Sequence, residues 1–319
     1  MTVSADTDRG SFSHTALFYR SPREYLDHLV PYVADAVAAG HPVLIAVPDP
    51  NLSALRDALP ADTREAVALA DMSQVGRNPS HILGGVLGTF AARHQTGPVR
   101  IIGEVAWSSR TEMEYPACVQ HEALVNEAFA DRDITLLCPY DATHLDSEIL
   151  VDAEITHPRL GRVGHPERTS DGFAPDAAWE RYNEPLPSSP SAASYTLHRL
   201  TDLAGARQFS AKYARWFGFA DAEIADLQLI VNELASNSLQ HGQGSCTLLL
   251  WEAGDQLISQ VRDAGQMTDR LAGRRPITNG RDQGYGLFVV NATADLVRIH
   301  STASGTTVQA HLRKRKSAG

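Results

Sequence analysis

The chain has 319 residues, too many for one typical domain and enough for two. Apolar residues make up 43% of it, which is sufficient for ordinary globular cores and excludes a wholly disordered chain. The formal net charge of −10 argues against a nucleic-acid-binding protein, because such proteins normally present a basic face.

The cysteines and the apolar runs indicate the cellular compartment in which we expect the protein. Cys118, Cys138 and Cys246 lack the spacing of a metal-binding motif and are typical of reduced thiols in a cytosolic protein. The N-terminal residues do not resemble a signal peptide, and no apolar run reaches the length of a membrane span. We therefore expect a soluble cytoplasmic protein that contacts neither a membrane nor, directly, nucleic acid.

The first half of the chain alternates short apolar runs with amphipathic ones. The strand-like runs are residues 14–19, 42–47, 66–71, 98–104 and 134–140, and the helical patterns are 22–39, 50–59, 79–95 and 113–130. The run "PVLIAV" is continuously apolar, as a buried parallel strand is. Strands that alternate with helices predict a mostly parallel, doubly wound sheet.

The second half has a different order of elements. Residues 161–192 contain five prolines in a polar stretch, and we interpret them as an interdomain linker. The pattern that follows predicts an α+β sandwich, in which helices cover one face of a mixed sheet. The predicted elements are a strand at 195–200, helices at 202–217 and 222–241, a hairpin at 246–263, a helix at 284–294 and a hairpin at 296–312.

The stretch "LQLIVNELASNSLQHGQG" (residues 227–244) combines an apolar stripe with a polar one. Glu233, Asn237 and His241 are four residues apart, so a helix places them on one slowly drifting stripe. The apolar stripe that begins at Leu227 would face the core. Taken alone, the polar stripe is most simply explained as the solvated face of an amphipathic helix.

Two later segments change this interpretation. "VRDAGQM" places Asp263 and Gly265 at the end of a strand, where a carboxylate can accept the exocyclic amine of adenine. "DQGYGLFVV" places Gly284 and Gly286 before an apolar helix, whose N–H groups can bind phosphates. The amide oxygen of Asn237 suits Mg²⁺, which prefers oxygen ligands. The three segments together predict a nucleotide pocket.

Residues 194–313 resemble the GHKL ATPase fold shared by histidine kinases, gyrase-type ATPases and anti-sigma factor serine kinases. "NELASNSLQHG" is similar to the N box of that family, "RDAG" to its first glycine box, "QGYGL" to its second and "GTTVQAHL" to its closing strand. The spacing of Glu, Asn and His is closest to the anti-sigma serine/threonine kinase branch. The sequence departs from the family in "DAGQM", which lacks the second glycine often seen after "DxG".

The resemblance implies ATP and Mg²⁺ as cofactors, Glu233 as the catalytic general base and Asn237 as the metal ligand. The alternative for Glu233 is a role in the water shell of the ion. Residues 266–283 would form a lid whose arginines, Arg274, Arg275 and Arg281, reach the terminal phosphate. The residues implied to bind the nucleotide and its ion are Asn237, His241, Asp263, Gly265, Arg281, Gly284, Gly286, Leu287 and Thr306.

Two of these positions have equally simple structural explanations. Thr306 is β-branched and suits a strand whether or not its hydroxyl contacts adenine. His241 would end a helix, where histidine is commonly a polar cap.

Residues 12–160 resemble the MEDS domain, a sensory module named from methanogens, methylotrophs and the regulator DcmR. The similarity lies in "HTALFYRSPREYLDHLVPYVADAVAAGHPVLIAVP", "RIIGEVAW", "ACVQHEALVNEAF", "LLCPYD" and "THP". The resemblance implies a RecA-like doubly wound α/β domain that senses a small molecule, yet the sequence has no phosphate-binding P-loop. The candidate lining residues are His14, Tyr19, Glu104, Trp107, Glu122, Asn126, Tyr140 and His157.

The predicted chain thus has a MEDS-like sensory domain (12–160), a linker (161–192) and a GHKL domain of Bergerat α+β type (193–315). The resemblance implies a serine/threonine kinase and anti-sigma factor, with a STAS-type anti-anti-sigma protein and a sigma factor as partners. A homodimer is compatible with the sequence. A non-catalytic, nucleotide-gated binding module is the alternative. A histidine kinase is disfavoured, because Pro158 beside His157 does not suit a long phosphoacceptor helix.

Overall fold

The computed structural model describes residues 11–277 and 284–315, and its contacts divide the chain into two compact units. The first unit takes in the described residues up to 76 and residues 89–179. The second takes in residues 77–88 and the described residues from 180 onward. Each unit has its own sheet and its own core. Within the part of the chain that the structure describes, every helix is too short or too polar to cross a lipid bilayer.

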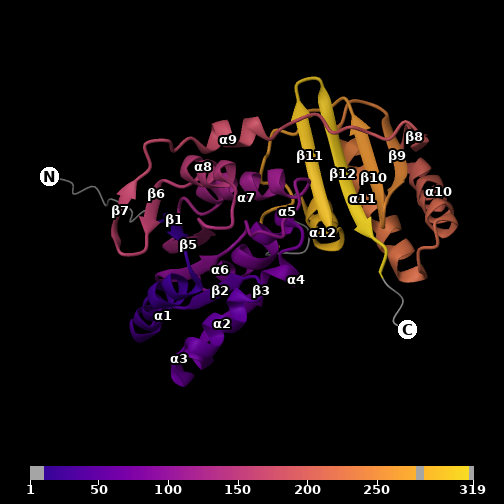
Figure 1. Cartoon of the computed structure of the whole chain (residues 1–319). Coiled ribbons are helices and arrows are strands. Elements are labelled where there is room, and N and C mark those ends of the chain that lie inside the picture. Colours follow the sequence, from indigo (N-terminus) through magenta and orange to yellow (C-terminus); the bar gives the residue numbers. More distant parts are fainter. Residues whose placement is uncertain (1–10, 278–283, 316–319) are drawn as a thin grey trace. The chain divides into compact units, whose positions relative to one another are not determined.

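The first unit is built on a seven-stranded sheet in the order β3-β2-β4-β5-β1-β6-β7 (Figure 1). Neighbouring strands are parallel from β3 to β6, and only β7 runs antiparallel to its neighbour. This confirms the predicted parallel-rich sheet. The strands are β1 (Ser13–Tyr19), β2 (Val43–Val47), β3 (Val67–Asp71), β4 (Val99–Gly103), β5 (Ile134–Asp141), β6 (Arg159–Arg162) and β7 (His165–Thr169).

Helices of the first unit pack apolar faces against this sheet. Leu29 and Val33 of α1 are fully buried and join Ile45 and Ile102 of the central strands in one core. Ser21 caps α1 by accepting a hydrogen bond from the N–H of Glu24. The helices are α1 (Pro22–Ala38), α2 (Asn51–Ala58), α3 (Ala61–Ala66), α4 (Met72–Val75), α6 (Thr89–Arg93), α7 (Tyr115–Ala128), α8 (Ser147–Thr156) and α9 (Pro175–Arg181), the last of which reaches the boundary of the unit.

Part of the stretch predicted as a linker has regular structure. The hairpin of β6 and β7 extends the first sheet, and α9 follows it. Sequence analysis missed these elements because two of the five prolines that suggested a linker, Pro166 and Pro175, sit within the exposed β7 and at the start of α9, where proline is tolerated. The proposed domain limits remain predictions.

The second unit contains a five-stranded sheet in the order β11-β12-β10-β9-β8 (Figure 1). Every strand pair is antiparallel, so the expectation of a mixed sheet is wrong. The strands β9 and β10 form one hairpin and β11 and β12 another, and short turns that contain or end at a glycine join the antiparallel strands of each directly. The strands are β8 (Ala193–Leu197), β9 (Cys246–Ala253), β10 (Gln256–Asp263), β11 (Leu296–Thr302) and β12 (Gly305–Arg313).

Three helices pack against the second sheet, α10 (Leu203–Trp216), α11 (Asp221–His241) and α12 (Tyr285–Thr293). Their apolar residues form one core with the strands, in which Ile230, Val290 and Leu248 are fully buried. This arrangement confirms the predicted α+β sandwich of GHKL type.

The helix predicted over residues 79–95 is not one α-helix. It divides into α5 (Pro79–His81), the π-helix η1 (Ile82–Gly88) and α6. Gly84 explains the break, because a Cβ there would lie 2.8 Å from the carbonyl oxygen of Arg274. Close backbone packing in the second unit therefore overrides the helical period of the sequence.

Side chains cover the outer edge of β11, the last strand of the second sheet. Asn78 accepts a hydrogen bond from the N–H of Val297, and Ser80 donates one to the Val297 carbonyl. Asn183 contacts the N–H and the carbonyl of Ser301 in the same way. An exposed strand edge is a site of unwanted pairing, and these side chains occupy its backbone groups.

Candidate functional site

Helix α11 carries the first half of the candidate site. Its buried side contains Leu227, Ile230 and Leu234, as the apolar stripe predicted. On the polar stripe, Glu233 and Asn237 are half-buried, whereas His241 is exposed at the last helical residue. The helix therefore holds a carboxylate and an amide one turn apart at the edge of the core.

The start of α12 meets this stripe. Gly284 precedes the helix in the left-handed region, with φ 95°, a conformation that suits glycine. A Cβ on Gly286 would lie 2.6 Å from Oε2 of Glu233 and 3.2 Å from Nδ2 of Asn237. Leu287 turns inward and is buried. The structure thus brings together the N box and the second glycine box, with the helix N-terminus beside the two polar side chains.

Asp263 and Thr306 form the other wall, as directly paired residues of β10 and β12. The N–H of Gly265 donates to Oδ1 of Asp263 at 2.8 Å, and the Thr306 hydroxyl donates to the carbonyl of Gly265 at 2.7 Å. A Cβ on Gly242, directly after α11, would lie 2.8 Å from Oδ1 of Asp263. The adenine candidates therefore lie together at the C-terminal end of α11.

Two arginines of the predicted lid, Arg274 and Arg275, lie in the described part of the chain. Arg274 is buried, which lowers its pKa to about 10, and Arg275 forms an ion pair with Asp269 at 2.5 Å. Arg281 lies outside the described residues. The role of these arginines at a terminal phosphate stays a prediction.

Asn291 is a residue that sequence analysis missed. It is buried inside the apolar helix α12, and its Nδ2 donates to the carbonyl of Gly273 at 2.9 Å. The backbone carbonyl of Asn291 accepts a hydrogen bond from Nδ2 of Asn78 at 2.8 Å. The signal was a lone amide in the apolar run "GLFVVNATADL", where a polar side chain requires a partner.

Two family models cover most of the chain. Residues 13–158 match the MEDS model, described as the MEthanogen/methylotroph, DcmR Sensory domain. Residues 197–312 match the model of the Histidine kinase-like ATPase domain. The chain joins a MEDS domain to a histidine kinase-like ATPase domain. The site built from α11, α12, β10 and β12 lies in the ATPase domain.

Likeness to individual proteins is weak. The crystal structure of the RsbU and RsbW domains of Rv1364c from Mycobacterium tuberculosis is 21% identical with a TM-score of 0.31, covering 41% of this chain and 34% of that one. The histidine kinase AdeS of Acinetobacter baumannii is 10% identical with a TM-score of 0.25, covering 64% and 98% respectively. The chain therefore spans about a third of the first of these structures. No curated protein matches. At these scores we base no argument on either structure.

The candidate residues of the MEDS domain fall into separate groups. Tyr19 and Glu104 share a hydrogen-bond donor, the Nδ2 of Asn51. Trp107 is apart from them and stacks under the guanidinium of Arg110, 3.6 Å from the ring centroid. The remaining candidates, His14, Glu122, Asn126, Tyr140 and His157, are joined in one network.

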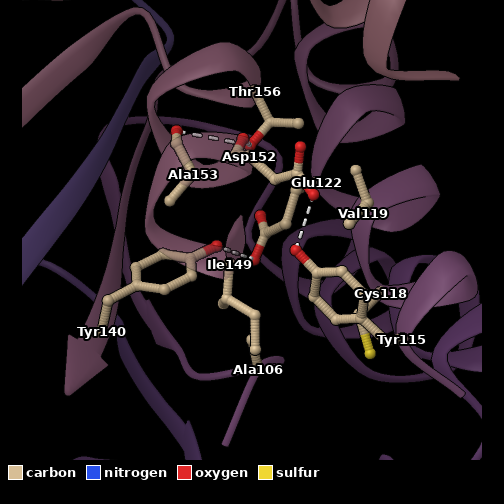
Figure 2. A pocket seen from close by; sticks show the side chains of 10 residues that line it. All are labelled: Ala106, Tyr115, Cys118, Val119, Glu122, Tyr140, Ile149, Asp152, Ala153 and Thr156. Atoms are coloured by element: carbon tan, nitrogen blue, oxygen red, sulfur yellow. Dashed lines mark hydrogen bonds between the residues drawn. The ribbon is translucent and has the colours of Figure 1, made fainter. Parts of the chain in front are cut away.

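Glu122 also lines a pocket between α7, α8 and β5 (Figure 2). Oε1 of Glu122 accepts a hydrogen bond from the Tyr140 hydroxyl at 3.4 Å. On the other side, the Tyr115 hydroxyl donates to Oδ2 of Asp152 at 2.7 Å. The pocket thus has two carboxylates in a largely apolar wall, and its volume of about 10 Å³ is room for about one water molecule. Its lining residues are Ala106, Tyr115, Cys118, Val119, Glu122, Tyr140, Ile149, Asp152, Ala153 and Thr156.

Proposed function

We propose that the ATPase domain is an ATP-dependent serine/threonine protein kinase that also acts as an anti-sigma factor. Its substrate would be a serine or threonine of a STAS-type anti-anti-sigma protein, and a sigma factor would be its second partner. The observation that carries this proposal is the contact of Gly286 with Glu233 and Asn237. This close approach supports one site made of a candidate base, a candidate metal ligand and a helix N-terminus.

The residues present fit ATP and Mg²⁺. Because Gly286 has no side chain, Glu233 and Asn237 come close to the first turn of α12. The N–H groups of this turn and the positive end of the helix dipole suit phosphates. The amide oxygen of Asn237 would hold Mg²⁺, and the carboxylate of Asp263 would accept the adenine amine. When bound, ATP with its ion supplies the phosphoryl group for transfer.

The surroundings of Glu233 support its proposed role as proton acceptor. Its Oε1 accepts a hydrogen bond from Nδ2 of Asn232 at 3.2 Å, which helps to orient the carboxylate. Its Oε2 faces Gly286, where the substrate hydroxyl would approach the phosphates. A positioned general base typically contributes about 10²–10⁴-fold to the rate.

Control by the MEDS domain is the second part of the proposal. Residues 77–88 fall within the MEDS match, yet they pack in the compact unit that contains the ATPase domain. Asn78 links them to Asn291 of α12. A small molecule that shifts this segment would therefore act on the helix whose N-terminus forms the phosphate site.

The experiment starts from a cognate partner isolated with the full chain from native extract. Phosphate transfer and ATP affinity are measured for wild type, Glu233→Ala, Asn237→Ala and the exposed control Glu252→Ala. We expect Glu233→Ala to slow transfer by about 10²–10⁴-fold while ATP still binds. Asn237→Ala should lose Mg²⁺-dependent binding, and Glu252→Ala should behave as wild type.

Three outcomes would redirect the proposal. Transfer at the wild-type rate by Glu233→Ala would reject Glu233 as the base. ATP-dependent capture of the partner without any phosphorylation would support the non-catalytic binding module. An acid-labile phosphate on a histidine of this chain would support a histidine kinase.

A further inference from the structure

Four buried side chains with metal-binding atoms meet on one face of the first sheet, beneath α7. They come from four separate elements: β1, α7, β5 and the residue directly after α8. None is more than 3% exposed, and their ligand atoms all lie within 4.8 Å of one another. The four residues are His14, Glu122, Cys138 and His157.

The sheet register explains how the first two strands contribute. In the parallel pair of β1 and β5, His14 stands opposite Leu136, and Cys138 follows two residues later on the same face. Glu122 lies on the buried side of α7, and its Oε2 is 3.2 Å from Nε2 of His14. The cluster is therefore a product of the fold and not of spacing within one element.

Four of the six separations between the ligand atoms are close to those around a tetrahedral zinc ion. With zinc bonds of about 2.0–2.3 Å, neighbouring ligand atoms in a tetrahedron are about 3.3–3.6 Å apart. Oε2 of Glu122 is 3.2 Å from Nε2 of His14, 3.6 Å from Nε2 of His157 and 3.7 Å from Sγ of Cys138. Sγ of Cys138 is 3.5 Å from Nε2 of His14.

Both histidines are held through Nδ1, and Nε2 of each faces Glu122. His157 is hydrogen-bonded through Nδ1 to the carbonyl of Ala153 at 2.8 Å, so Nδ1 carries the proton. Nδ1 of His14 is 3.1 Å from Oδ1 of Asn126, whose Nδ2 donates to backbone carbonyls, including that of Thr156. The amide orientation makes Oδ1 the acceptor, so Nδ1 of His14 donates and Nε2 faces Oε2 of Glu122. Histidine ligands are commonly held in this way.

One nitrogen of the cluster lacks a partner in the described part of the chain. Among the described residues, Nε2 of His157 has no hydrogen-bond partner and lies 3.6 Å from Oε2 of Glu122. A buried polar atom without a partner is unfavourable, and a cation between this nitrogen and the Glu122 carboxylate would satisfy both groups.

We propose that the MEDS domain binds one zinc ion at this cluster. The mixed nitrogen and sulfur donors favour zinc over Mg²⁺ or Ca²⁺, which prefer oxygen ligands. On binding, the Cys138 thiol releases its proton and coordinates as the thiolate. Of the four residues, Glu122 also lines the pocket of Figure 2. The four ligand atoms are Nε2 of His14, Oε2 of Glu122, Sγ of Cys138 and Nε2 of His157.

The test uses the full chain, freed of metal with a chelator and then titrated with Zn²⁺ and, separately, with Co²⁺. Cys138→Ser removes one ligand, and Cys118→Ser is the matched control, because Cys118 is equally buried in the same domain but lies outside the cluster. We expect wild type and Cys118→Ser to bind one equivalent of Zn²⁺. Their Co²⁺ forms should show intense tetrahedral visible bands and a thiolate charge-transfer band.

Cys138→Ser should lose the charge-transfer band and bind Zn²⁺ at least about 100-fold more weakly. If this variant fails to fold, the wild-type Co²⁺ spectrum decides alone, since an octahedral spectrum or the lack of a thiolate band overturns the proposal. Less than one equivalent of Zn²⁺ in wild type, or an unchanged thiolate band in folded Cys138→Ser, would also overturn it. ATP binding is expected to be the same in apo and zinc-loaded protein, which separates this test from the kinase proposal.

Discussion

Gly286 lies directly over the carboxylate of Glu233, so close that a Cβ on the glycine would be 2.6 Å from Oε2. These residues belong to motifs about fifty positions apart, and α11 and α12 bring them together. Glycine is required at position 286 because a side chain there would displace Glu233, whereas the helix itself would be more stable with alanine. In a helix, glycine costs roughly 0.5–1 kcal/mol relative to alanine. A substitution at Gly286 should therefore affect the stability of the fold and the binding of ATP differently.

Gly286→Ala should therefore weaken ATP binding at least about tenfold while leaving the melting temperature unchanged or higher. The new methyl group meets the end of a flexible carboxylate, which can move aside, so folding survives while Glu233 is displaced. Calorimetry with ATP and thermal melts would measure both effects. Gly172→Ala is the control, because a Cβ there would make only an ordinary contact, 3.9 Å from the Ser170 hydroxyl. Unchanged ATP affinity in Gly286→Ala would show that this contact is not part of the nucleotide site.

Asp263→Asn should weaken ATP at least about tenfold, because a hydrogen bond to a charged group contributes about 1.5–3 kcal/mol. Wild type should prefer ATP to GTP, since guanine has no exocyclic amine at the matching position. Titration calorimetry with both nucleotides tests this, with the exposed Asp255→Asn as control. Equal affinity of wild type for ATP and GTP would remove the adenine assignment.

The strongly periodic segments could be predicted from the sequence. The continuous apolar run of β2 and the two stripes of α11 each allow one interpretation, and the structure has both elements. The segment around Gly84 could not be predicted, because its conformation depends on packing against the backbone of Arg274. Tertiary contacts there override a helical period.

The zinc cluster shows a second limit of sequence reasoning. Spacing rules detect ligands that share one element or one turn, and Cys138 has no histidine or cysteine at such a distance. His14 and His157 were candidates for a ligand site, yet nothing in the sequence placed Cys138 beside them. Only the pairing of β1 with β5, and the passage of the chain from α8 to β6, assembles the four residues.

Glu104→Gln should change how stability depends on pH. Burial raises the pKa of Glu104 to about 8, so the folded state holds a proton that the unfolded chain, with a pKa near 4.5, releases. The stability from neutral Glu104 is fully present below about pH 4.5 and is lost as pH rises through about 8. The variant keeps a neutral side chain throughout. Relative to Glu104→Gln, the free energy of unfolding of wild type should fall by up to a few kcal/mol between about pH 5 and about pH 8.

Urea denaturation of wild type and Glu104→Gln at both ends of that range measures the difference, in which all other titrating groups cancel. Glu65→Gln, an exposed position, is the control and should show no trend against wild type. A constant difference between wild type and Glu104→Gln across the range would mean that Glu104 is ionised in the folded protein.

Asn78→Ala should loosen the edge strand β11 at one defined point. The Asn78 side chain is buried, and its loss leaves the N–H of Val297 without the acceptor it has at 3.2 Å. An unpaired buried donor costs about 1–3 kcal/mol, so the Val297 amide should exchange with deuterium roughly five- to a hundred-fold faster. Asn183→Ala is the matched comparison, because Asn183 accepts from the N–H of Ser301 on the same edge but is only half-buried. Water can replace the Asn183 side chain, so in Asn183→Ala the exchange rate of the Ser301 amide should rise less and that of the Val297 amide should not change. Hydrogen exchange read at individual amides distinguishes the two, and unchanged protection of Val297 in Asn78→Ala would show that residues 77–88 do not hold this strand.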